Sequence, residues 1–108
     1  MVRQIVVEDG GALVVPPTAV IQALAEGPRA NAIDEILDGA VQPNLDRERI
    51  RLAAHLIVST GTRDIPDALV AAEALLRTPS IVITSDPRDL RALLHADERG
   101  RRVEVWEV

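Results

Sequence analysis

The sequence has no cysteine, phenylalanine, tyrosine or lysine, and Trp106 is its single tryptophan. The absence of cysteine excludes disulfides, thiolate nucleophiles and cysteine-ligated zinc sites. With no other aromatic residue, the hydrophobic core has to consist of aliphatic side chains. The chain also lacks an apolar run of membrane length and a secretory leader pattern, so we expect a soluble cytoplasmic protein with no membrane partner.

Length and composition indicate one small folded domain over residues 1–108. Apolar residues make up 47% of the chain, which excludes a disordered chain. The formal net charge is −5, whereas a protein that binds nucleic acid nonspecifically is expected to be basic. All twelve basic residues are arginine, whose planar guanidinium pairs well with phosphate. The absence of lysine is itself typical of a GC-rich genome.

Strands alternate with helices along the chain, which predicts an α/β fold with a largely parallel sheet. Residues 2–7 fit two interpretations, because their β-branched side chains favour a strand while Val2, Ile5 and Val6 share one helical face. The helix that Asp46 caps is expected to bury one apolar face, formed by Ile50, Ala53, Ala54 and Ile57. The expected elements are a strand at 12–15, helices at 18–27 and 29–37, a weak strand at 40–45, helices at 46–61 and 64–77, a strand at 80–85, a helix at 87–96, a polar loop at 97–102 and a strand at 103–108.

Two carboxylates, Asp86 and Asp89, stand at a joint where a buried strand runs straight into a helix. Ligands of open α/β sheets gather at the carboxyl ends of strands, and Mg²⁺ takes oxygen ligands such as carboxylates. Both residues also suit helix capping, because Asp86 precedes Pro87 as an N-cap and Asp89 falls three positions later. The same two interpretations apply to Asp64, which is suited as an N-cap, and to Asp67 in the first turn of its helix.

The stretch 60–72, read together with 83–91, resembles the second half of a PIN domain. One acidic residue opens a helix in the sequence Asp67-Ala68-Leu69, and another closes a strand in Thr84-Ser85-Asp86. The resemblance extends upstream and covers the chain from about residue 10 onward. It implies an N-terminally truncated, PIN-like three-layer α/β sandwich with a mostly parallel sheet.

Members of the PIN-domain family are mostly Mg²⁺- or Mn²⁺-dependent nucleases, and many small bacterial ones are toxins paired with an antitoxin. The resemblance therefore implies an endoribonuclease that cleaves RNA phosphodiesters, with RNA and an antitoxin protein as partners. By motif position Asp67 and Asp86 are implied to be the catalytic metal ligands, and Asp64 and Asp89 to be supporting metal-site acids. In such sites the ion activates a bound water and steadies charge on the phosphate.

The chain departs from the family pattern in two places. The first strand, which is central in the sheet and ends in an aspartate, has no counterpart, and Gln22 stands where a glutamate is usual. Asp9 fits as the missing acid only if the residues around Pro16 and Pro17 form the next helix, which two prolines forbid. The central position is open to residues 2–7 or to a partner chain, and a third interpretation places the missing strand upstream of the first residue. An exposed sheet slot favours a homodimer.

The missing acid leaves two functions open: an active metal-dependent endoribonuclease, and a PIN-like domain without catalysis that serves as a binding or dimerisation module. The remaining polar residues have structural interpretations. His55 is expected to be a half-buried helix residue, His95 a cation at a helix C-terminus, and the arginines of the 97–102 segment a solvated loop. Trp106 on the last strand is expected to expose a face that joins a dimer.

Overall fold

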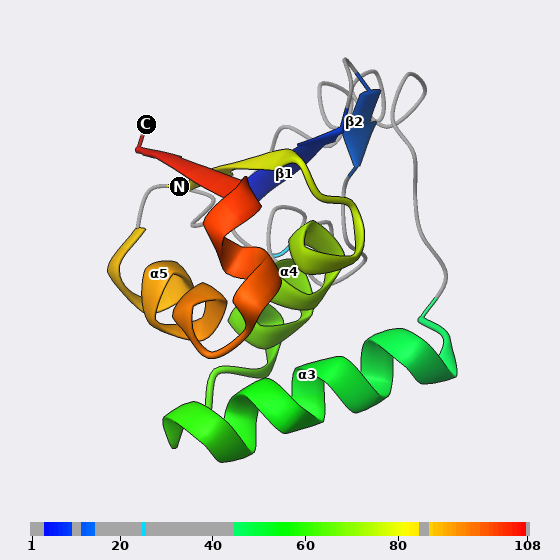
Figure 1. Cartoon of the computed structure of the whole chain (residues 1–108), viewed down its shortest axis with the longest axis vertical. Helices are drawn as coiled ribbons and strands as arrows, with labels where there is room; N and C mark the ends of the chain where they lie inside the picture. Colours follow the sequence, from blue (N-terminus) through cyan, green and yellow to red (C-terminus); the bar gives the residue numbers. More distant parts are fainter. Residues whose placement is uncertain (1–3, 10–11, 15–24, 26–44, 85–86, 108) are drawn as a thin grey trace.

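A computed structural model describes residues 4–9, 12–14, 25, 45–84 and 87–107 of the chain (Figure 1). Within these residues helices pack against one sheet, so the expected α/β class is confirmed. The elements expected between Thr18 and Asn44 lie outside the described residues, apart from Ala25, which is helical. In chain order the described elements are β1 (Gln4–Asp9), β2 (Ala12–Val14), α3 (Arg47–Thr60), α4 (Ile65–Leu76), β3 (Ser80–Thr84), α5 (Pro87–His95), the 3-10 helix η1 (Glu98–Arg102) and β4 (Val103–Glu107).

The four described strands form one sheet in the order β2-β1-β3-β4. Only β3 and β4 are parallel, with Val82 opposite Val105, whereas β1 is antiparallel to both of its neighbours. The expectation of a mostly parallel sheet is therefore wrong for the described strands. The connections explain the difference, because β1 and β2 are joined by two residues, which allows a hairpin, and parallel strands need a long crossover. That crossover exists between β3 and β4, where α5 and η1 intervene.

Residues 4–9 form a strand and occupy the position between β2 and β3. Gln4 lies opposite Thr84 and Glu8 opposite Ile81, so β1 starts at the edge of the sheet where β3 ends. Asp9 lies at the far end of β1, about 17 Å away at 3.4 Å per residue. The interpretation of Asp9 as the missing acid therefore fails, because the antiparallel register carries its backbone away from the end of β3.

Helix α3 begins and ends where the sequence predicts. The Oδ1 atom of Asp46 accepts the backbone N–H of Arg49 at 2.9 Å, and Gly61 closes the helix with φ of 72°, a left-handed conformation that suits glycine. The predicted inward face is only partly right. The residues buried on α3 are Ala53 and Leu56, whereas Ile50 is 50% exposed and Ala54 is also exposed. Apolar residues stand on several sides of this helix, so their spacing alone does not select a face.

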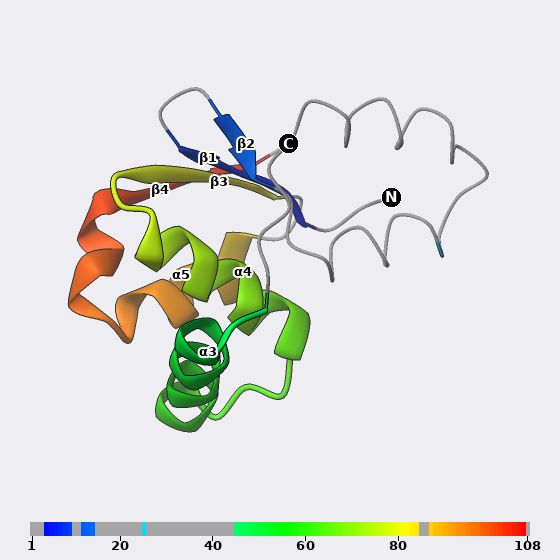
Figure 2. The ribbon, with the colours of Figure 1, turned by 90° about the vertical axis from the view of Figure 1, so that its right-hand side faces the viewer.

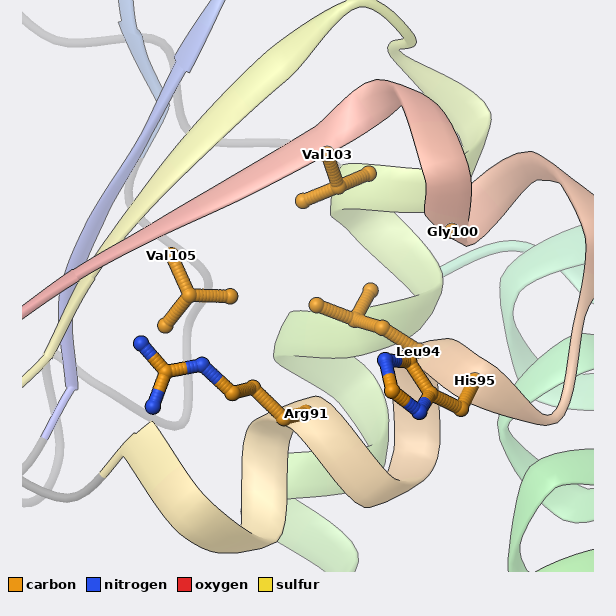
Figure 3. A pocket seen from close by; sticks show the side chains of 6 residues that line it. All are labelled: Arg91, Leu94, His95, Gly100, Val103 and Val105. Atoms are coloured by element: carbon orange, nitrogen blue, oxygen red, sulfur yellow. The ribbon is translucent and has the colours of Figure 1, made fainter.

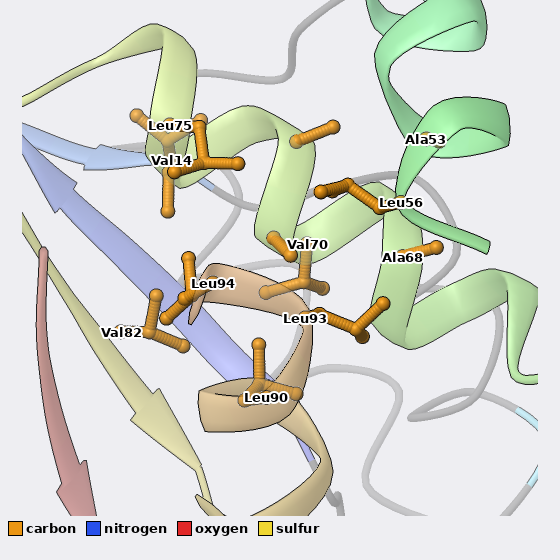
Figure 4. Packing of buried hydrophobic residues seen from close by; sticks show 13 residues of the cluster. Val14, Ala53, Leu56, Ala68, Val70, Leu75, Val82, Leu90, Leu93 and Leu94 are labelled. Atoms are coloured by element: carbon orange, nitrogen blue, oxygen red, sulfur yellow. The ribbon is translucent and has the colours of Figure 1, made fainter. Parts of the chain in front are cut away.

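Helix α4 is the centre of the described fold, and residues Asp67 to Leu75 are buried except for Leu69. It packs against α3, α5 and the sheet, and Figure 2 shows all three helices on one side of the sheet. A helix that is apolar on nearly every side is stable only when its surroundings are protein. The core is aliphatic, as predicted (Figure 4), and consists of Val14, Ala53, Leu56, Ala68, Val70, Ala71, Ala72, Ala74, Leu75, Val82, Leu90, Leu93 and Leu94.

The C-terminal elements follow the prediction closely, except that the polar loop at 97–102 contains the short helix η1. Strand β4 is at an edge of the described sheet, and Trp106 on it is 53% exposed. Its indole N–H donates to Oε2 of Glu104 at 3.0 Å, two residues back on the same face of the strand. Among the described helices, none is both long and apolar enough to cross a membrane.

Candidate metal centre

Three aspartates from two helices converge at one end of the described fold. Asp64 and Asp67 come from the start of α4, and Asp89 comes from the first turn of α5. One carboxylate oxygen of each lies within 4.8 Å of the others. In the described part of the chain, this is the one group of three acidic or histidine side chains with that spacing.

A chain of local hydrogen bonds fixes the start of α4. The hydroxyl of Thr60 accepts the N–H of Thr62 at 3.3 Å, and the hydroxyl of Thr62 accepts the N–H of Asp64 at 3.2 Å. Oδ1 of Asp64 then accepts the N–H of Asp67 at 3.0 Å, which confirms Asp64 as the N-cap. These bonds set the backbone from which both carboxylates of α4 project, whereas the position of Asp89 depends on the packing of α5.

The three carboxylates differ in burial. Asp67 is completely buried, Asp64 is half-buried and Asp89 is exposed. The cluster therefore extends from the protein interior to the surface. A carboxylate is expensive to bury without compensation, and the N-terminus of α4 offers some, because the helix dipole places partial positive charge there.

The close spacing of the three carboxylates favours a positive charge among them. Two carboxylates 4.8 Å apart repel each other by about 1 kcal/mol in water and by about 3 kcal/mol at the effective dielectric of a protein surface. A cation bound among the three oxygens would turn this repulsion into attraction. The donors are all carboxylate oxygens, which suits Mg²⁺ or Mn²⁺ and does not suit the softer metals that prefer sulfur or imidazole.

The structure thus brings together three of the four predicted metal-site residues. The fourth, Asp86, and the substituted position Gln22 lie outside the described residues. Thr84, the last residue of β3, stands two residues before Asp86 in the sequence and is completely buried. Of the two histidines, His55 is on an exposed part of α3 and His95 ends α5, and neither belongs to the cluster.

Sequence reasoning missed a second buried carboxylate, Glu73 in α4. Its side chain is 3% exposed. Its carboxylate accepts hydrogen bonds from Nε of Arg49 at 2.5 Å, from Nη2 of Arg49 at 3.0 Å and from Nε of Arg77 at 2.5 Å. The hydrogen bonds to Glu73 raise the pKa of the Arg49 guanidinium above its usual value. The spacing of Glu73 and Arg77 by four residues is readable from the sequence, but the contact with Arg49 depends on how α3 packs on α4.

No family model, curated protein or solved structure matches this chain. The interpretation of the aspartate cluster therefore rests on its own geometry and on the motifs in the sequence.

Proposed function

We propose that this chain is a Mg²⁺- or Mn²⁺-dependent endoribonuclease of the PIN-like, toxin–antitoxin type. The observation that carries the proposal is the convergence of Asp64, Asp67 and Asp89, with an oxygen of each inside 4.8 Å. Asp67 is one of the two motif positions and Asp64 and Asp89 are the two supporting acids that the resemblance implies, and their proximity does not follow from helix capping. Capping accounts for Asp64 alone, because Asp67 and Asp89 come from different helices and only the tertiary packing brings them together.

The proposed fold is an N-terminally truncated PIN-like three-layer sandwich. The described residues contribute the sheet and the layer formed by α3, α4 and α5. In this proposal β1 takes the place of the missing central strand, with its direction reversed. The core then keeps its central strand although the acid that normally follows that strand is absent.

In the proposed mechanism, the buried Asp67, Asp64 with its capping bond and the exposed Asp89 would hold the ion. Asp86 would be a fourth ligand. The bound ion would lower the pKa of a coordinated water and offset the charge that develops on the scissile phosphate. Before an ion binds, the three carboxylates repel a phosphate group, so approach of the scissile phosphate to the cluster would depend on the metal.

A second candidate function is a PIN-like module without catalysis, which binds a partner or a second copy. The reversed direction of β1 favours this second candidate. The β1 residue paired with Thr84, at the end of β3, is Gln4, and Gln4 is not an acid. Losing one carboxylate lowers the charge available to an ion that relies on few protein ligands. The exposed Trp106 on edge strand β4 is the surface on which this candidate would place a homodimer contact.

Replacing Asp67 by asparagine separates the two candidates. We expect RNA cleavage in Mg²⁺ or Mn²⁺ to fall at least about 100-fold, since even groups that only support a metal ligand cost 10–100-fold when removed. The melting temperature should stay within a few degrees, because asparagine has nearly the same shape. Asp46→Asn is the matched control: Asp46 caps α3 away from the cluster, and asparagine caps as well as aspartate. Full cleavage by Asp67→Asn would exclude the proposed site, and absence of metal-dependent cleavage by the unmodified chain would favour the module.

A further inference from the structure

A cavity of about 130 Å³ lies between α5 and β4, on a part of the molecule that the aspartate cluster does not use. Its apolar wall consists of Leu94, Val103 and Val105, and its polar groups belong to Arg91 and His95 (Figure 3). An apolar cavity of about 150 Å³ accommodates a benzene-sized ligand. The cavity is thus large enough for one small chemical group.

Two basic side chains enter this cavity from the same helix. Arg91 and His95 are four residues apart on α5, which places them on one face. Figure 3 shows the Arg91 guanidinium reaching toward Val105 and the His95 ring lying beside Leu94. Within the part of the chain that the structure describes, neither side chain forms a hydrogen bond or an ion pair. Their hydrogen-bond donors are therefore available to a ligand.

The end of the cavity is closed by backbone. A Cβ atom on Gly100 would lie 2.0 Å from the carbonyl oxygen of Leu94, so η1 packs directly against the last turn of α5. Val103, Val105 and Leu94 form the apolar wall on the other side. Arg91 and His95 are both exposed, so a phosphate group can reach their donors from solvent.

A wider hollow of about 310 Å³ continues from this cavity and shares Leu94, His95 and Gly100 with it. Arg101 adds a third basic side chain there, and Glu98 lines the same hollow. The Asp97 carboxylate, also in the lining, accepts three hydrogen bonds from Arg99, at 2.8, 3.0 and 2.9 Å. Arg99 thus offsets the charge of Asp97, and His95 and Arg101 add two basic groups to the lining of the hollow.

We propose that the cavity between α5 and β4 binds a phosphate group, held by the Arg91 guanidinium and the His95 imidazole. Guanidinium donors form paired hydrogen bonds with phosphate oxygens, and the size of the cavity admits a phosphate but not a whole nucleotide beside it. The phosphate belongs either to an RNA strand that lies along the β4 edge or to a small phosphate ester. The RNA source rests on the proposed function, whereas phosphate binding itself does not.

Titration of the full-length protein with inorganic phosphate at constant ionic strength tests the site, with the His95 ring proton resonances as the signal. We expect a saturable shift in the unmodified chain and in Arg88→Gln. Arg88 is an exposed arginine of the same helix that does not line the cavity. In Arg91→Gln the affinity should fall at least about tenfold. The proposal is wrong if the unmodified chain shows no saturable shift, if Arg88→Gln weakens binding as much, or if acetate binds as tightly.

Binding of a short single-stranded RNA in the presence of a chelator then distinguishes the sources. If RNA is the source, Arg91→Gln weakens RNA binding clearly more than Arg88→Gln does. If both variants bind RNA like the unmodified chain while phosphate binding is lost only in Arg91→Gln, a small phosphate ester is the ligand and the RNA source is excluded. Phosphate binding in a protein that shows no metal-dependent cleavage would overturn the proposed function and leave this site intact.

Discussion

Replacing Glu73 by alanine removes the acceptor that joins two helices of the core. The Glu73 carboxylate forms ion pairs with Arg49 from α3 and with Arg77 at the end of α4. Helix α4 carries Asp64 and Asp67 at its other end, so this network anchors the helix on which two of the cluster acids stand. The change removes this carboxylate from both guanidinium groups, although Arg49 keeps its ion pair with Asp46 at 2.8 Å.

The cost follows from burial. Removing one partner of a buried ion pair typically costs 3–5 kcal/mol, because an uncompensated charge is left behind. The Glu73 side chain is 3% exposed, but those of Arg49 and Arg77 are 18% and 22% exposed and can recover some water. We therefore expect a loss of about 3 kcal/mol, at the lower end of that range. For a domain of this size the loss corresponds to a fall in melting temperature of about 12–24 °C.

Urea unfolding followed by circular dichroism measures this loss directly. Glu98→Ala is the control, since Glu98 is an exposed acid on η1 and its removal should change the unfolding free energy by less than about 0.5 kcal/mol. Glu73→Gln should fall between the two, because the amide keeps one acceptor oxygen. A Glu73→Ala variant as stable as the control would show that the network contributes nothing to holding α3 on α4.

Two further predictions concern the C-terminal part of the fold. Gly100→Ala should lower the melting temperature, because its new Cβ would lie 2.0 Å from the Leu94 carbonyl oxygen and the backbone of η1 has to move; an unchanged melting curve would contradict this close approach. The second concerns Asp97, where side-chain hydrogen bonds from Arg99 hold the pKa of the carboxyl below its ordinary value. A lowered folded-state pKa stabilises the fold above the unfolded value of about 4, and this stabilisation is lost as the pH falls through the folded value. Asp97→Asn should therefore destabilise the protein at pH 7 and progressively less as the pH falls below about 4, and a loss in thermal unfolding that does not shrink with falling pH would exclude this linkage.

The elements with clear start and stop signals were predictable from the sequence. Asp46 and Gly61 bound α3, and Asp64 starts α4, because capping depends on residues within one turn of the helix end. Strand β1 was not predictable, since residues 2–7 suit a strand and a helix equally and only pairing with β3 decides between them. The predicted buried face of α3 was wrong at Ile50 and Ala54, which are exposed. This helix carries apolar residues on several of its sides, so their spacing did not select one face.

The candidate site was likewise predictable in part from the sequence. Its residue types and order along the chain came from the motifs around Asp67 and Asp86, with Asp64 and Asp89 as supporting acids. Their proximity depends on how α4 and α5 pack, which no local pattern encodes. The contact of Arg49 with Glu73 and the cavity at Arg91 arise from the same packing of distant segments, and for this reason sequence reasoning missed both.

Calorimetric titration with Mg²⁺ and with Mn²⁺ tests the central claim, that Asp64, Asp67 and Asp89 form a metal site, most directly. For the unmodified chain we predict a saturable heat at millimolar metal, which disappears over the same range in Asp67→Asn and persists in Asp46→Asn. The absence of heat above background for the unmodified chain, or equal binding by Asp67→Asn, would contradict the metal site and with it the nuclease.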